Sequence, residues 1–119
     1  MKVQRGDVVI IDHPFSDATG AKVRPAVVVQ SDARNALLRE TVVVLVSKNL
    51  KHIGTDPTQL LIDIATPDGK LSGLRVDSAV KCGKLFTLHE DMIRKKIGVL
   101  SAPLMKQVND CLKAALDLP

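Results

Sequence analysis

The chain has 119 residues, of which 45% are hydrophobic and 25% are charged. This length and balance are typical of one compact domain, so we expect a single domain over residues 1–119 and no second one. The longest uninterrupted apolar run, residues 42–46, is far shorter than the roughly 18 residues that a membrane span needs, and other runs such as 60–62 are shorter still. We therefore expect a cytoplasmic protein without contact to a membrane.

The charged residues make the chain moderately basic, with 17 Lys and Arg against 13 Asp and Glu and a net charge of +4. This excess fits a polyanionic partner, because each neutralised phosphate releases counterions, although many ordinary domains are as basic. Trp and Tyr are absent and Phe occurs only twice, which argues against base stacking on aromatic platforms. A nucleic acid would have to be held by charge and hydrogen bonds.

The cysteines and histidines are not spaced along the sequence as metal ligands usually are. Cys82 and Cys111 lie far apart without a C-x-x-C pattern, so we expect two reduced structural thiols rather than a bridge. His13, His52 and His89 are scattered, and none forms an H-x-x-x-H pair. We expect neither a metal site nor a cofactor.

The predicted secondary structure consists mostly of short strands. Residues 7–12, 25–30 and 41–46 are rich in β-branched side chains and are separated by polar or glycine-containing segments. Further strands are predicted at residues 59–64, at 78–81 leading on to 85–88, and at 97–100, with turns at 67–69, 72–73 and 82–83. A short helical turn is predicted at residues 89–93. The total is six or seven strands.

A helix is predicted after Ser101, which is a good N-cap, with Pro103 in its first turn. Apolar side chains recur there at helical spacing, and we expect their stripe to face the core rather than a partner: Leu104, Met105, Val108, Cys111, Leu112, Ala115 and Leu116. Because no helices alternate with the strands, a parallel α/β sheet is disfavoured. The pattern favours a mainly β fold, a small antiparallel barrel with a C-terminal helix packed on it.

One strand pair brings chemically useful side chains together. If Gln30 faces Thr41 in an antiparallel pair, the numbers of paired residues sum to 71, and Arg24 lies opposite Ser47 with β-carbons roughly 5 Å apart. A guanidinium presents a planar fork of donors to phosphate oxygens, and a hydroxyl adds a neutral donor. The alternative is that Arg24 forms an ordinary surface ion pair and that Ser47 is an ordinary turn residue.

Several segments together resemble the MazF/PemK family of toxin endoribonucleases. They are R-G-D-V-V at residues 5–9, K-V-R-P-A-V-V-V at 22–29, the strand at 41–47, D-S-A-V at 77–80 and I-G-V-L at 97–100 ahead of the last helix. The resemblance implies an SH3-like barrel of the MazF/PemK/CcdB type. It also implies a homodimer that cuts single-stranded RNA, mRNA in particular, at short sequence motifs without a metal. A cognate acidic antitoxin is implied as partner, with a segment that folds onto the basic cleft and blocks RNA.

By the same resemblance, Arg24 and Ser47 are the expected catalytic residues. Attack of the ribose 2′-hydroxyl on the adjacent phosphorus leaves a 2′,3′-cyclic phosphate and a 5′-hydroxyl. Since its pKa lies above about 12, Arg24 suits charge stabilisation better than proton abstraction, and Ser47 would hold a phosphate oxygen. Expected RNA contacts are His13, Ser16, Asp17, Lys22, Lys48, Asn49 and Lys81.

The general base stays open at this point. In some members of the family a further arginine or acidic residue near residues 81–86 takes part, where this chain has Lys81, Gly83 and Phe86. His13 could titrate usefully, because the ordinary histidine pKa is about 6.5, but a lone histidine at a strand end is more often a plain surface residue. Two other functions remain as alternatives: a CcdB-like gyrase inhibitor, for which residues 113–119 show no motif, and a non-catalytic RNA-binding barrel.

Overall fold

The computed structural model describes residues 2–12 and 23–119, and no helix in these ranges is long and apolar enough to cross a membrane. The described elements follow one another as β1 (Asp7–Asp12), β2 (Val23–Val28), α1 (Asp32–Leu37), β3 (Glu40–Ser47), β4 (Gln59–Ile62), α2 (Pro67–Leu71), β5 (Ser78–His89), the 3-10 turn η1 (Glu90–Met92), β6 (Ile93–Val99) and α3 (Ala102–Leu116).

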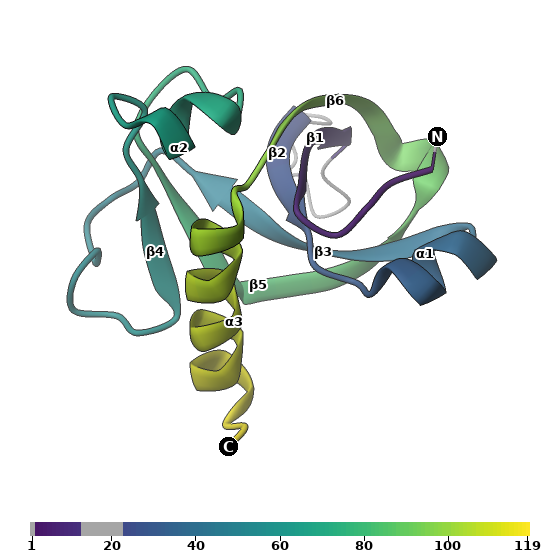
Figure 1. Cartoon of the computed structure of the whole chain (residues 1–119). Coiled ribbons are helices and arrows are strands. Elements are labelled where there is room, and N and C mark those ends of the chain that lie inside the picture. Colours follow the sequence, from purple (N-terminus) through teal and green to yellow (C-terminus); the bar gives the residue numbers. More distant parts are fainter. Residues whose placement is uncertain (1, 13–22) are drawn as a thin grey trace, which may run out of the picture.

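The six strands form one antiparallel sheet in the order β4-β5-β3-β2-β1-β6. The sheet curls, so that β6, β1 and β2 make a rounded end while β4 and β5 lie beside α3 (Figure 1). The mainly β class with antiparallel pairing and a terminal helix is confirmed. The curl does not close into a fully paired barrel, because β4 and β6 form the two edges of the described sheet.

The central strands are buried on both faces. Neighbours such as Val8 and Val9 point to opposite sides of β1, and both are fully buried in two separate apolar clusters. The first cluster lies between the sheet and α3, and the second lies inside the curl of β1, β2, β3, β5 and β6. This double burial explains why the strands read as continuous apolar runs rather than alternating ones.

The C-terminal helix α3 forms where its N-cap residue and its apolar stripe predict it. The Ser101 hydroxyl accepts a hydrogen bond from the Leu104 N–H at 3.4 Å, which satisfies one of the free donors of the first turn. Leu104, Val108 and Cys111 are buried against the sheet. Most of the apolar stripe therefore belongs to the core, as expected, but Leu116 in the last turn is 49% exposed, so the prediction is wrong for that residue. The predicted helical turn near residue 90 is also confirmed, as η1.

Other boundaries differ from the prediction. Helices α1 and α2 were not predicted: they have six and five residues, too few to show a helical period, and only their caps Ser31 and Thr66 mark them. The turn predicted at residues 82–83 is wrong, because β5 continues through it. The register with β3 instead shifts there, from Val44 opposite Leu85 to Leu45 opposite Lys81, so the extra residues are absorbed as a bulge.

Candidate active site

The register that brings Arg24 and Ser47 together is confirmed. The structure pairs Ala26 with Leu45, Val27 with Val44 and Val28 with Val43, so each pair sums to 71. Beyond these pairs, both strands extend toward the same edge of the sheet: β2 begins at residue 23 and β3 ends at residue 47. Continued two residues beyond the last recorded pair, this register brings Arg24 opposite Ser47, and both residues line the same two cavities.

The first cavity is an open groove of about 880 Å³. Its floor crosses the sheet, since Lys95 on β6 pairs with Ile10 on β1, and Ile10 pairs with Pro25 on β2. Residues 73–76 form another part of its lining. The charged and hydroxyl side chains of the lining are Arg24, Ser47, Lys48, Arg75, Ser78, Lys95 and Lys96.

The second cavity is a small pocket of about 150 Å³ that adds Lys81 and Lys84 to the Arg24 and Ser47 pair. Successive side chains of a strand point to opposite faces of a sheet. On β3, Val46 packs into the core under α3, whereas Leu45 packs against the core inside the curl. Arg24 and Ser47 therefore lie at the rim where the two faces meet, between the groove and the pocket. We call these rim residues the Arg24–Ser47 centre.

The Ser47 hydroxyl has a defined orientation. Its oxygen accepts a hydrogen bond from the Asn49 backbone N–H at 3.1 Å, and the Asn49 side chain in turn accepts one from the Lys51 N–H at 3.0 Å. These bonds are those of a polar turn, so the structural role considered for Ser47 is present. Because the hydroxyl oxygen is the acceptor there, its hydrogen is left to donate into the cavities. Asn49 shapes this turn without lining either cavity.

The cations around the groove fall into two groups. Lys96, in the lining, pairs at 3.1 Å with Asp7, whose side chain is 6% exposed. The other cations of the lining, including Arg24, Arg75 and Lys95, form no ion pair with another described residue. Their charges are available to an anion, so the groove presents positive charge next to the Arg24–Ser47 centre.

The chain that follows α2 is held against β6 by two glycines. A Cβ atom on Gly73 would lie 2.0 Å from the Ile97 carbonyl oxygen, and one on Gly98 would lie 2.4 Å from the Leu71 carbonyl oxygen. Gly73 also has a φ of +73°, which other residues rarely adopt. Backbone therefore packs directly on backbone, and this contact places Arg75 at the groove.

Of the other predicted RNA contacts, Lys48 lines the groove and Lys81 lines the pocket. His13, Ser16, Asp17 and Lys22 lie outside the described residues. Sequence reasoning did not single out three cations that the fold brings to the cavities: Arg75, Lys84 and Lys95. Their positions far apart in the sequence carry no local signal. In the described ranges no three His, Cys, Asp or Glu side chains cluster as metal ligands would.

Comparisons with known proteins cover nearly the whole chain. Residues 4–116 match the family model of the PemK-like, MazF-like toxin of type II toxin–antitoxin systems. The chain is 29% identical over 119 residues to endoribonuclease MazF6 of Mycobacterium tuberculosis, which covers 99% of this chain and 100% of the relative. It is also 29% identical over 122 residues to endoribonuclease MazF9 of the same organism, with 98% of each chain covered.

Solved structures give the same result. A mycobacterial endoribonuclease in complex with its cognate antitoxin superposes with a TM-score of 0.76 at 26% identity, covering 98% of this chain and 97% of that one. The MazE–MazF complex of Deinococcus radiodurans superposes with a TM-score of 0.74 at 20% identity over the full length of both chains, which supports the fold. The chain belongs to the PemK-like, MazF-like toxins of type II toxin–antitoxin systems.

Proposed function

We propose that this protein is the toxin of a type II toxin–antitoxin system and acts as an endoribonuclease that cuts single-stranded RNA, chiefly mRNA, at short sequence motifs without a metal. The observation that carries the proposal is the Arg24–Ser47 centre, which joins a guanidinium and a serine hydroxyl at the rim of a basic groove. Its setting is a chain similar over its full length to MazF endoribonucleases. The same chemistry gives no reason to bind gyrase, so the CcdB-like alternative is not favoured.

The proposed reaction needs little covalent chemistry from the protein. The ribose 2′-oxygen attacks the adjacent phosphorus and the bond to the 5′-oxygen breaks, which leaves a 2′,3′-cyclic phosphate and a 5′-hydroxyl. Arg24 stabilises the negative charge that develops on the non-bridging oxygens and gives a proton to the leaving 5′-oxygen. The proton of the 2′-hydroxyl is released to solvent water, and Arg24 regains its proton from solvent. Ser47 donates a hydrogen bond to one phosphate oxygen. The substrate's own 2′-hydroxyl is the nucleophile, so DNA is not cut.

The proton of the 2′-hydroxyl has no described carboxylate or imidazole to accept it, because neither group lines the groove or the pocket in the described part of the chain. Gly83 likewise supplies no carboxylate in β5. Rate acceleration at this centre is therefore attributed to stabilisation of developing charge, which is usually the largest contribution to catalysis. Lys48 and Lys81 are assigned to phosphate binding, and His13, Ser16, Asp17 and Lys22 to orienting the RNA.

Charge also supports the proposed partners. Several cations of the groove form no ion pair within residues 2–12 and 23–119, which fits an acidic antitoxin segment that folds onto the groove and excludes RNA. We further propose a homodimer, as in the family, and a cytoplasmic location, where messenger RNA is available.

The test is cleavage of a labelled single-stranded RNA in buffer that contains EDTA, with product ends mapped for cyclic phosphate. We expect Arg24→Ala to abolish cleavage and Ser47→Ala to slow it by a factor of roughly 10 to 1,000. Lys113→Ala, an exposed cation near the end of α3, is the control and should cleave as the wild type does. Full activity of the Arg24→Ala protein would end the assignment.

A further inference from the structure

The groove and the pocket beside the Arg24–Ser47 centre differ too much in size to hold the same part of an RNA. The groove, at about 880 Å³, is in the range of sites that enclose whole small molecules. The pocket, at about 150 Å³, is far smaller and is lined mainly by Lys81, Lys84 and the centre itself. The pocket suits a phosphate, whereas the groove has room for a nucleotide with its base.

The lining of the groove has the chemistry that a base requires. Ile10 and Pro25 line its floor, and Val23 and Val76 are 51% and 45% exposed. These apolar surfaces can cover the face of a base. The polar edge of a base needs donors, and the groove offers them as cations whose charges are not neutralised within the described chain.

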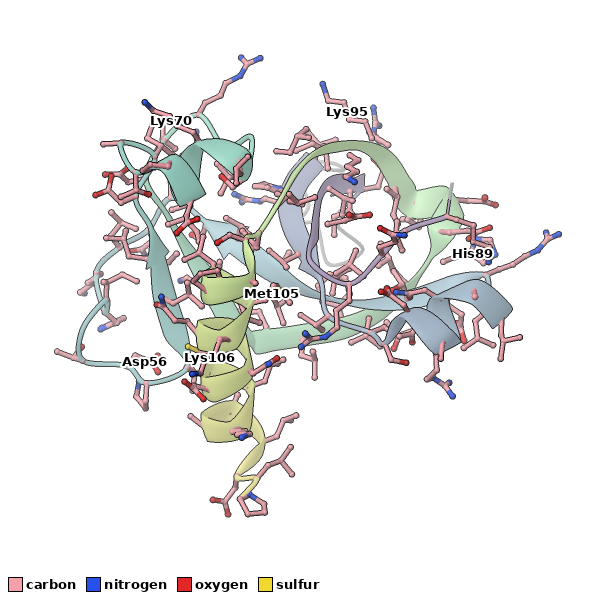
Figure 2. The ribbon with its side chains drawn as sticks, in the orientation of Figure 1. Asp56, Lys70, His89, Lys95, Met105 and Lys106 are labelled. Carbon is pink, nitrogen blue, oxygen red and sulfur yellow. The ribbon has the colours of Figure 1, made fainter. Side chains whose placement is uncertain are left out.

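Two of these cations lie away from the centre. Lys95 on β6 pairs with Ile10 on β1, and Ile10 pairs with Pro25 on β2. The backbone at Lys95 is therefore two strand spacings, about 10 Å, from the backbone of β2. A nucleotide therefore fits between Lys95 and the Arg24–Ser47 centre. In Figure 2 the Lys95 side chain extends outward from β6, at the same end of the molecule as Lys70 on α2. Lys95 is thus placed to hold the next phosphate of the strand.

Arg75 is the second cation, and the chain around it is ordered before any ligand arrives. The Gly73 and Gly98 contacts hold the backbone against β6. The Leu74 N–H donates to the Ser72 hydroxyl at 3.2 Å, and the Asp77 carboxylate accepts from the Ile64 N–H at 3.0 Å. A guanidinium on such a support can make paired hydrogen bonds to a base edge, as arginine does with guanine, at a small entropic cost.

We propose that this groove is the base-selecting subsite of the enzyme. Arg75 reads a base on one side of the scissile bond, and Lys95 holds the phosphate beyond that base. Lys81 and Lys84 hold a phosphate on the other side of the bond. The proposal rests on the proposed endoribonuclease function and assigns to this groove the choice of the cleaved motif.

The test uses an RNA pool with randomised positions on both sides of the cut, and sequencing of the product ends. Arg75→Ala is expected to relax base selection by about fivefold or more at positions on one side only. Arg75→Lys keeps the charge without the planar fork of donors, so it should cleave at the wild-type rate with the same relaxed base selection as Arg75→Ala. Lys95→Ala and Lys84→Ala should lower kcat/KM for all sequences alike and flatten its dependence on salt.

Lys70→Ala is the matched control, because Lys70 is an exposed cation on α2 that lines neither cavity. Its cleavage motif and rate should equal those of the wild type. If the wild type cleaves and Arg75→Ala keeps the cleavage motif of the Lys70→Ala control, this inference is refuted while the proposed function stands. If the wild-type protein cleaves no RNA, both are refuted. The melting temperatures of all variants should agree, since the substituted side chains are exposed.

Discussion

The contact between β6 and the chain that follows α2 allows a stability prediction with a built-in control. In Gly98→Ala, the new Cβ atom would lie 2.4 Å from both the Leu71 carbonyl oxygen and the Ser72 carbonyl carbon. Both are backbone atoms, so neither can rotate away and one segment has to shift. Overpacking of this kind costs about 1–3 kcal/mol in the free energy of unfolding. With an unfolding entropy of about 0.25 kcal/mol per kelvin for this length, the melting temperature should fall by about 4–12 °C.

Gly83→Ala is the control, because the same substitution there meets open space. The nearest atom to its Cβ would be the Thr58 hydroxyl oxygen at 3.8 Å, an ordinary contact. Alanine restricts the unfolded chain, so this variant should gain about 0.4–1 kcal/mol. Thermal unfolding followed by circular dichroism measures both variants. Equal melting temperatures, or a Gly98→Ala protein as stable as the wild type, would refute the backbone-on-backbone account of the groove.

Two further predictions concern the core under α3. Val108→Ala, at a fully buried position, should lower the free energy of unfolding by about 2 kcal/mol. Leu116→Ala, at a position that is 49% exposed, should change it by less than about 0.5 kcal/mol. Urea denaturation measures both variants, and equal losses would contradict the packing of α3 on the sheet. Burial raises the pKa of the Cys82 thiol to about 12 and also raises the pKa of Cys111. The folded state thus holds thiol protons that the unfolded chain releases near pH 9, so the free energy of unfolding should decline as the pH rises from about 9 toward 12. For the same reason, iodoacetamide at pH 8 should modify the thiols of the folded protein slowly. Rapid alkylation of the folded protein would contradict this burial.

The elements that were predicted well are those whose signals are local. The strand at residues 7–12 has the predicted bounds, because a run of β-branched side chains between polar segments is itself the signal. The terminal helix combines a cap, a proline in the first turn and four turns of apolar spacing. Helices α1 and α2 lack that length, and the bulge in β5 depends on the partner strand, so neither could be predicted from the same kind of pattern.

The Arg24–Ser47 centre could be placed from the sequence because it depends on a single antiparallel pair, in which one correct register fixes every other partner. The groove beside it could not. Arg75 reaches the site from the chain that follows α2, and Lys84 and Lys95 reach it from β5 and β6. Which cations form ion pairs depends on Asp7 and Asp12, which lie far from them in the sequence. Only the tertiary structure decided those contacts, because they form between backbones and charges far apart in the chain, where no periodicity or cap records them.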